Sequence, residues 1–230
     1  MKFSQVLKSA ALAAAVVAAP AFAQSYSFVS GSGVLAFDSG LIGALGAGGT
    51  VVSAVDGATY ASGSVTSTVT GITLNGSNTV TEVFSSGGAL QTAPVNFAGN
   101  GGNVTIKNLD VVISGSTANV YADISGANGL ATQTHFLMWT ATSVSGDTAV
   151  TGTTFSSKVD NLYITAAGKA ALIQGLGLTA IGQGVLAGVS TYGTLSTNAV
   201  FAPVPEPSTY ALMGLGLAAV GFVARRRAAK

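Results

Sequence analysis

The chain has 230 residues, of which 48% are hydrophobic and only 7% are charged, and its formal net charge is +1. A typical soluble domain carries about 25% charged residues, so serine, threonine and asparagine must solvate most of this surface. The absence of cysteine excludes a disulfide framework, thiolate zinc sites and cysteine nucleophiles. The single histidine excludes metal centres built from several imidazoles.

Residues 1–23 have the three regions of a secretory signal peptide. Lys2 and Lys8 supply the positive start, residues 10–19 form a short apolar helix, and a small-x-small cleavage site follows. An apolar run of about 10 residues is too short to cross a hydrocarbon core of about 30 Å, so we expect signal peptidase to remove it. The residues that define the predicted cut are Ala21, Ala23 and Gln24, the last of which begins the mature chain.

Residues 24–203 form the body, which is long enough for one domain with its own core. Hydrophobic and polar residues alternate in several Val- and Thr-rich runs, and this period indicates β-strands. Asn and Gly cluster at 100–103 and 128–129, and both residue types tolerate the positive φ angles of tight turns. The predicted strands are 64–74, 105–113, 119–124 and 134–142.

Two segments interrupt the strand pattern, and we expect both to be short helices. Ser39 can cap a helix that carries Leu41, and Thr165 can cap a second helix that continues to Gln174. Gly175 then provides the stop of the second helix. The order of strands and helices predicts a mainly β fold, either a β-sandwich or a partly open barrel-like body, with two short helices.

Residues 204–230 combine a proline element, an apolar stretch and a basic end. The prolines should stiffen the first part, because each proline fixes φ and removes a hydrogen-bond donor. Residues 209–224 carry no charge and reach the lower length limit for a spanning helix, so we predict a transmembrane helix whose basic end stays cytoplasmic. The proline element is Val204, Pro205, Glu206, Pro207 and Ser208, and the basic end is Arg225, Arg226, Arg227 and Lys230.

Pro205-Glu206-Pro207, the short apolar helix and the terminal arginines together resemble the PEP-CTERM sorting signal of exported bacterial proteins. The resemblance covers residues 204–230 alone. It implies recognition by an exosortase, a membrane transpeptidase that removes the tail near the motif, in Gram-negative bacteria that also make extracellular polysaccharide. It further implies a precursor tethered to the inner membrane and a mature protein at the cell surface or in an extracellular matrix such as a biofilm.

The body is mildly acidic once the two ends are set aside. It holds only Lys107, Lys158 and Lys169 as cations, against seven carboxylates. A nucleic-acid-binding protein needs a basic face that engages phosphates. We therefore exclude nucleic acid as a partner.

The glycine spacing and the strand–helix order of the body resemble exported HtaA-type haem-uptake modules, which are β-rich with short helices. This resemblance implies a ligand-binding role. Where those modules would have a histidine before a glycine pair, this chain has Ser86-Gly87-Gly88. No haem ligand carries over to that position, and we expect no cofactor.

His135 lies in the run 133–139, where alternation places it on the face opposite Phe136 and Met138. A structural histidine on a sheet face, a haem or metal ligand, and a general base are all compatible with this position. The sequence identifies no partner for it.

The remaining motifs do not assign catalytic, cofactor-binding or metal-ligating residues. A serine hydrolase needs Gly-x-Ser-x-Gly, and residues 188–193 are one residue too long. Residues 175–180 match G-x-G-x-x-A but follow a predicted helix, so we interpret them as a helix end and loop. The body acids show no i, i+2 pair for calcium, although Asp110 and Asp123 could meet across a hairpin as a glycosidase-like pair.

We therefore expect a non-enzymatic component of the cell surface or extracellular matrix. Strands rich in Ser, Thr and Asn offer a hydroxylated surface suited to extracellular polysaccharide or to other copies of the chain. A haem-type ligand-binding module is the alternative, and a secreted hydrolase is the second alternative.

Overall fold

The computed structural model describes residues 25–205 and 207–228. The chain divides into a body, Tyr26–Pro203, and a separate C-terminal part that begins at Val204. The predicted signal peptide and its cleavage residues Ala21, Ala23 and Gln24 lie outside the described residues, as does Glu206 of the proline element.

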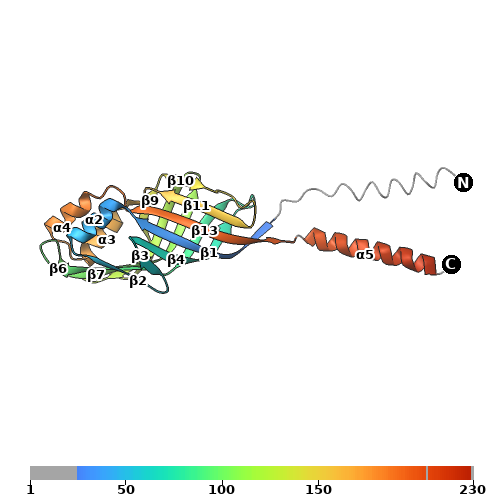
Figure 1. Ribbon diagram of the computed structural model, residues 1–230, viewed down its shortest axis with the longest axis horizontal. Helices are drawn as coiled ribbons and strands as arrows, with labels where there is room; N and C mark the ends of the chain where they lie inside the picture. Colours follow the sequence, from blue (N-terminus) through green and yellow to red (C-terminus); the bar gives the residue numbers. More distant parts are fainter. Residues whose placement is uncertain (1–24, 206, 229–230) are drawn as a thin grey trace. The chain divides into compact units, whose positions relative to one another are not determined.

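The body consists of strands and three short helices (Figure 1). The strands are β1 (Ser25–Phe37), β2 (Val51–Val55), β3 (Thr59–Ala61), β4 (Ser64–Leu74), β5 (Val80–Ser86), β6 (Gly88–Val95), β7 (Asn100–Ser114), β8 (Thr117–Gly126), β9 (Gln133–Ala141), β10 (Ser143–Gly146), β11 (Thr154–Asp160), β12 (Tyr163–Ile164) and β13 (Gly193–Val204). The helices of the body are α2 (Ser39–Ala47), α3 (Ala166–Gly175) and α4 (Ala180–Ala187).

All these strands belong to one sheet, in the order β10-β11-β13-β1-β4-β5-β7-β8-β9-β12, and β6 joins β7 to β2 while β3 pairs with β4. The sheet curls into a partly open barrel, and α2, α3 and α4 gather at one end of it (Figure 1). The barrel alternative is therefore confirmed over the two-sheet sandwich. The first and last strands of the path, β10 and β12, do not pair with each other, so the barrel is not closed.

Period-two alternation identified four strands correctly but missed others, including the long strands β1 and β13. The runs 64–74 and 134–142 correspond to β4 and β9, and the other two predicted strands lie inside β7 and β8. The turn predicted at 128–129 is present, with Asn128 at φ 55° and Gly129 at φ 78°. The turn predicted at 100–103 is wrong, because those residues begin β7 and the positive φ angles there occur within a strand.

One helix cap was predicted correctly, one lies a residue earlier than predicted, and one helix was not predicted. Thr165 caps α3 as predicted, because its hydroxyl accepts a hydrogen bond from the Gly168 amide at 2.9 Å. The cap of α2 is Asp38 rather than Ser39, since the Asp38 carboxylate accepts from the Gly40 amide at 2.8 Å. Helix α4, which Thr179 caps, was not predicted, because its two glycines have low helix propensity.

The interior of the barrel is filled by side chains from alternate strand positions. Strand β8 shows the pattern plainly, with Ala118, Val120, Ala122 and Ile124 buried and the intervening residues facing outward. Trp139 and Met138 of β9 are both fully buried, which breaks the alternation at the end of that strand. The two helices α3 and α2 contribute Leu172 and Leu41 to the same core.

The C-terminal part contains one helix, α5 (Pro207–Ala228). The helix predicted over 209–224 is thus present, and it continues through the arginines. Within the part of the chain that the structure describes, no helix combines the length and the apolar character needed to cross a membrane. The membrane-spanning part of the prediction is therefore not confirmed.

Candidate functional site

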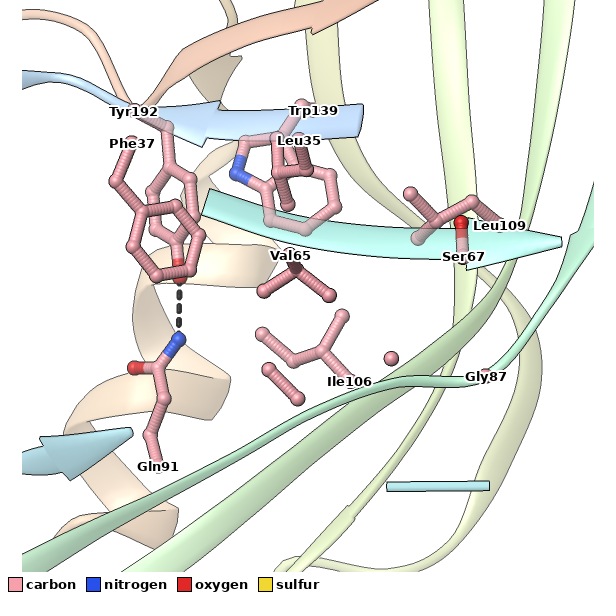
Figure 2. A pocket seen from close by; sticks show the side chains of 12 residues that line it. Leu35, Phe37, Val65, Ser67, Gly87, Gln91, Ile106, Leu109, Trp139 and Tyr192 are labelled. Atoms are coloured by element: carbon pink, nitrogen blue, oxygen red, sulfur yellow. Dashed lines mark hydrogen bonds between the residues drawn. The ribbon is translucent and has the colours of Figure 1, made fainter. Parts of the chain in front are cut away.

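A buried polar pair lies inside the barrel, next to a cavity of about 20 Å³ (Figure 2). The Gln91 side-chain amide donates a hydrogen bond to the Tyr192 hydroxyl at 2.6 Å, and both residues are almost completely buried. Gln91 comes from an inward position of β6, and Tyr192 immediately precedes β13. Other residues that line the cavity include Leu35, Phe37, Val65, Ile106, Leu109 and Trp139.

The backbone and two aromatic rings hold Tyr192 in place. Its amide donates to the Leu162 carbonyl at 2.7 Å, and its carbonyl accepts from the Asp38 amide at 3.0 Å. The Trp139 ring lies 4.9 Å from the Tyr192 ring, and the Phe37 ring packs edge-on at 5.7 Å. The arrangement fixes the phenol oxygen beside Gln91 and leaves little freedom for either side chain.

Burial controls the protonation of this site. It raises the pKa of Tyr192 to about 12, and the hydrogen bond from Gln91 opposes this only in part. Trp139 is fully buried, and its indole Nε1 has no hydrogen-bond partner among the described residues. Neutral donors, and no charges, therefore converge on the cavity.

A second cavity of about 40 Å³ lies between the helices and β6. Gln91 lines both cavities, so its side chain separates them. Both are far smaller than the roughly 300 Å³ that a drug-sized ligand needs. The apolar lining of the second cavity includes Leu41, Leu45, Leu172, Leu178, Val185 and Leu186.

The Gln91–Tyr192 pair makes a testable contribution to stability. We expect Tyr192→Phe to lower the free energy of unfolding by about 1–3 kcal/mol, because the buried Gln91 amide loses its acceptor.

The raised pKa of Tyr192 also predicts a pH effect. Tyr192 stabilises the folded state fully below pH 10.0, and this stabilisation is lost as pH rises toward about 12. Urea unfolding and the ultraviolet titration of tyrosinate would measure both effects. A late titration step that survives in Tyr192→Phe would contradict the assignment.

A second cluster surrounds His135 on the outside of the sheet. The imidazole stacks on the Tyr121 ring at 4.0 Å, with 9° between the planes, and its Nε2 lies 2.9 Å from Asp110 Oδ2. The His135 side chain is 60% exposed, whereas Phe136 and Met138 pack toward the core. The backbone of His135 has φ 50°, beside an irregularity in the β8–β9 register. Such strained non-glycine residues are concentrated at functional sites.

The structure brings both carboxylates of the predicted hairpin pair to His135, but in different roles. Asp110 contacts the imidazole, whereas Asp123 accepts from the His135 backbone amide at 3.2 Å and from the Asn108 side-chain amide at 2.9 Å. Burial, followed by the charge of Glu82, raises the pKa of Asp110, and the bond to His135 opposes that shift. Asp110 Oδ1 is buried and has no hydrogen-bond partner within residues 25–205 and 207–228.

The raised pKa of Asp110 sets the sign of a pH effect. Protonated Asp110 stabilises the folded state fully below pH 3.8, and this stabilisation is lost as pH rises through the raised folded pKa. We therefore expect the stability of the native chain relative to Asp110→Asn to decrease on going from about pH 3 to about pH 8. Urea unfolding of both proteins across that range would measure it. A relative stability that increases with pH would show that the carboxylate gains more from His135 than it loses by burial.

The other motifs of the sequence have structural positions. Residues 175–180 connect α3 to α4, with Gly177 at φ 64°, so their interpretation as a helix end and loop is confirmed. Gly188 is the C-cap of α4. Gly87 and Gly88 line the first cavity. They are the glycine pair that a histidine would precede in the haem-uptake modules. In the described ranges, no group of three or more His, Asp or Glu side chains is arranged to hold a metal ion.

Sequence reasoning missed Gln91, Tyr192 and Tyr121. Of these three, Gln91 could most easily have been found from the sequence. It shares one face of the alternating run 89–93 with Ala89 and Ala93, and it is the polar residue on that otherwise small, apolar face. Its partner Tyr192 is 101 residues away, and no pattern in the sequence connects them.

Comparisons with known proteins agree with both resemblances. Residues 203–227 match the PEP-CTERM protein-sorting motif. No curated protein matches the chain. The fold is similar to the C-terminal domain of HtaA from Corynebacterium glutamicum, with TM-score 0.57 and 11% identity over 77% of this chain and 100% of that one. It is also similar to the haem-binding protein HtaB from the same organism, with TM-score 0.51 and 14% identity over 79% of this chain and 98% of that one.

Proposed function

We propose that this chain is an exported bacterial surface protein that an exosortase sorts through its C-terminal tail. The observation that carries the proposal is the PEP-CTERM match at residues 203–227. The matched segment contains the proline element, most of helix α5 and the arginines. Signal peptidase would process the N-terminus, and the tail would hold the precursor at the inner membrane until the exosortase cuts near Pro205 and Pro207.

The body then performs a binding or structural role, without catalysis, at the cell surface or in the extracellular matrix. Its outward strand positions support this role, because they carry hydroxyl groups in place of charges. On β4, for example, Thr66, Thr68 and Thr70 are exposed while Val65 and Val69 pack in the core. A neutral hydroxylated surface suits extracellular polysaccharide or neighbouring copies of the chain.

Processing of the tail tests the proposal directly. We expect Glu206→Ala, and separately the replacement of Arg225, Arg226 and Arg227 by glutamine, to leave uncut precursor in the membrane fraction. We expect deletion of 204–230 to release a soluble body. Mass spectrometry of the mature C-terminus in the native host would measure each outcome.

A matched substitution outside the motif provides the control for that experiment. Glu82→Ala also removes one carboxylate, but from β5 of the body, so its tail should be processed normally. Normal processing of both Glu206→Ala and the arginine variant would contradict the sorting proposal.

A haem-type ligand-binding module is the second candidate. The similarity to HtaA and HtaB supports it at the level of the fold. In addition, the half-buried Tyr121 stacks on the exposed His135, and both residue types can ligate iron. Haemin added to the purified chain should then produce the intense violet absorbance band of bound haem, and His135→Ala or Tyr121→Phe should weaken it. Equal spectra for the native chain and both variants would exclude this site.

A further inference from the structure

In the sheet, β13 lies between β11 and β1 (Figure 1). An open groove with both polar and apolar lining groups lies on the outer side of these three strands. Its volume is about 450 Å³, far larger than either cavity inside the barrel. The residues that line it are Ser30, Gly31 and Ser32 of β1, Thr154, Phe155 and Ser156 of β11, Asn198, Ala199 and Val200 of β13, and Asp147.

The floor of the groove is backbone, because the nearby side chains are small or point inward. Phe155 and Ala199 face each other in the β11–β13 register and are both buried in the core. Position 31 needs a glycine because the neighbouring strands come very close to it. A Cβ there would lie 2.8 Å from the Asn198 carbonyl oxygen and 3.1 Å from Val69 Cβ. A larger residue at position 31 would separate the strands, because its Cβ would point toward the core residues Val69 and Ala199.

The polar groups along the groove are partly fixed and partly free. Ser156 donates its hydroxyl to Asn198 Oδ1 at 2.9 Å, and its backbone amide donates to Asp147 Oδ2 at 2.8 Å. With respect to the described residues, this leaves the Asn198 side-chain NH₂ available as a donor and the other Asp147 oxygen available as an acceptor. The hydroxyls of Ser30 and Thr154 face the same groove at exposed positions.

These groups exclude most classes of ligand. The groove contains no cation for a phosphate or carboxylate, and Asp147 would repel both. The nearest lysine on β11, Lys158, is paired with Asp160 at 2.6 Å. An extended peptide could not add as a strand here, because β1, β11 and β13 are paired on both sides.

We propose that this groove binds a neutral polysaccharide chain. Sugar hydroxyls both donate and accept, which matches the hydroxyl, amide and single carboxylate groups that the groove offers. Val200 is 44% exposed and supplies an apolar contact for the C–H face of a sugar ring. The groove lies along the side of a strand and is open, so it fits internal units of a chain rather than its end.

The hydroxylated surface continues beyond the groove on β4. Ser32 of β1 is paired with Thr68, and Val34 with Thr66, so exposed threonines extend the polar face in register. A chain bound in the groove can therefore contact further hydroxyls to one side. This inference names the partner class of the proposed surface role and rests on that role for its biological setting.

Affinity electrophoresis of the full chain in mild detergent tests the proposal. Native gels would contain dextran, hydroxyethylcellulose or galactomannan as neutral probes, and alginate as an anionic probe. We expect at least one neutral polymer to retard the chain and alginate not to. Ser156→Ala combined with Asn198→Ala should weaken the apparent affinity at least about tenfold, because the amide donor and its positioning hydroxyl are lost. Thr154→Trp should abolish binding by filling the groove.

Asn119 provides matched controls, because it is exposed on β8, whereas the groove lies on β1, β11 and β13. Asn119→Ala and Asn119→Trp should be retarded like the native chain, and thermal unfolding would confirm that all variants fold. The proposal is overturned if no neutral polymer retards the native chain, if alginate retards it equally, or if Thr154→Trp still binds. Tail processing is measured separately by mass spectrometry. A negative result for sorting can therefore be distinguished from a negative result for polysaccharide binding in the groove.

Discussion

We expect Gly88→Ala to lower the free energy of unfolding by at least about 3 kcal/mol, the upper end of the usual cost of overpacking a core. Gly88 begins β6 and is paired with Lys107 of β7 on one side and Val55 of β2 on the other. A Cβ added there would overlap the Ile106 carbonyl oxygen and would lie 2.5 Å from Lys107 Cα. Because the overlap is with backbone, no rotamer change can relieve it, and β6 must move away from β7.

This loss is large relative to the total stability of a domain, which is about 5–15 kcal/mol. Gly43→Ala is the matched control, because Gly43 lies in α2 and a Cβ there would meet nothing within 4 Å. It should stabilise the chain by up to about 1 kcal/mol through helix propensity. Urea unfolding followed by circular dichroism would measure both variants. Equal midpoints for Gly88→Ala and the native chain would show that β6 and β7 do not approach as closely as described.

The repeating parts of the fold were predictable because they depend on local spacing. Alternation along Ala118–Ile124 identified β8, and the Thr165 cap fixed the start of α3. The same reasoning failed where glycine changes the backbone. Gly101 and Gly102 looked like a turn but lie in β7, and the glycines of α4 concealed a helix. Glycine permits several conformations, so the surrounding structure decides which one forms.

The candidate sites could not be predicted, because each of them is assembled from distant segments. Gln91 and Tyr192 come from β6 and from the residue before β13, and His135 meets Asp110 only because β7, β8 and β9 are neighbours. The groove likewise combines β1 with β11 and β13, and neither its depth nor its glycine floor is visible in the sequence. Composition did predict its chemistry, since a surface with few charges must be solvated by hydroxyl and amide groups.

Trp139→Ala should also be strongly destabilising, by about 3–5 kcal/mol. Trp139 is fully buried in β9, is paired with Val120, and packs its indole against Tyr192. It already lines a cavity of about 20 Å³, which the substitution would enlarge. Urea unfolding followed by circular dichroism would measure the loss, because the variant lacks the only tryptophan of the chain. Phe97→Ala is the control, since Phe97 is 62% exposed and should change stability by no more than about 0.5 kcal/mol.

Trp139→Phe separates packing from hydrogen bonding at the same position. The substitution keeps an aromatic ring and removes the indole N–H, which has no partner in the described part of the chain. A buried donor without an acceptor costs about 1–3 kcal/mol, so its removal offsets part of the lost packing, and we expect a net loss below about 1.5 kcal/mol. Retaining the N–H would be favourable only if a polar group entered the cavity and accepted from it. A loss in Trp139→Phe as large as that in Trp139→Ala would therefore show that Nε1 is satisfied in solution, and that the cavity beside Gln91 and Tyr192 holds a polar group.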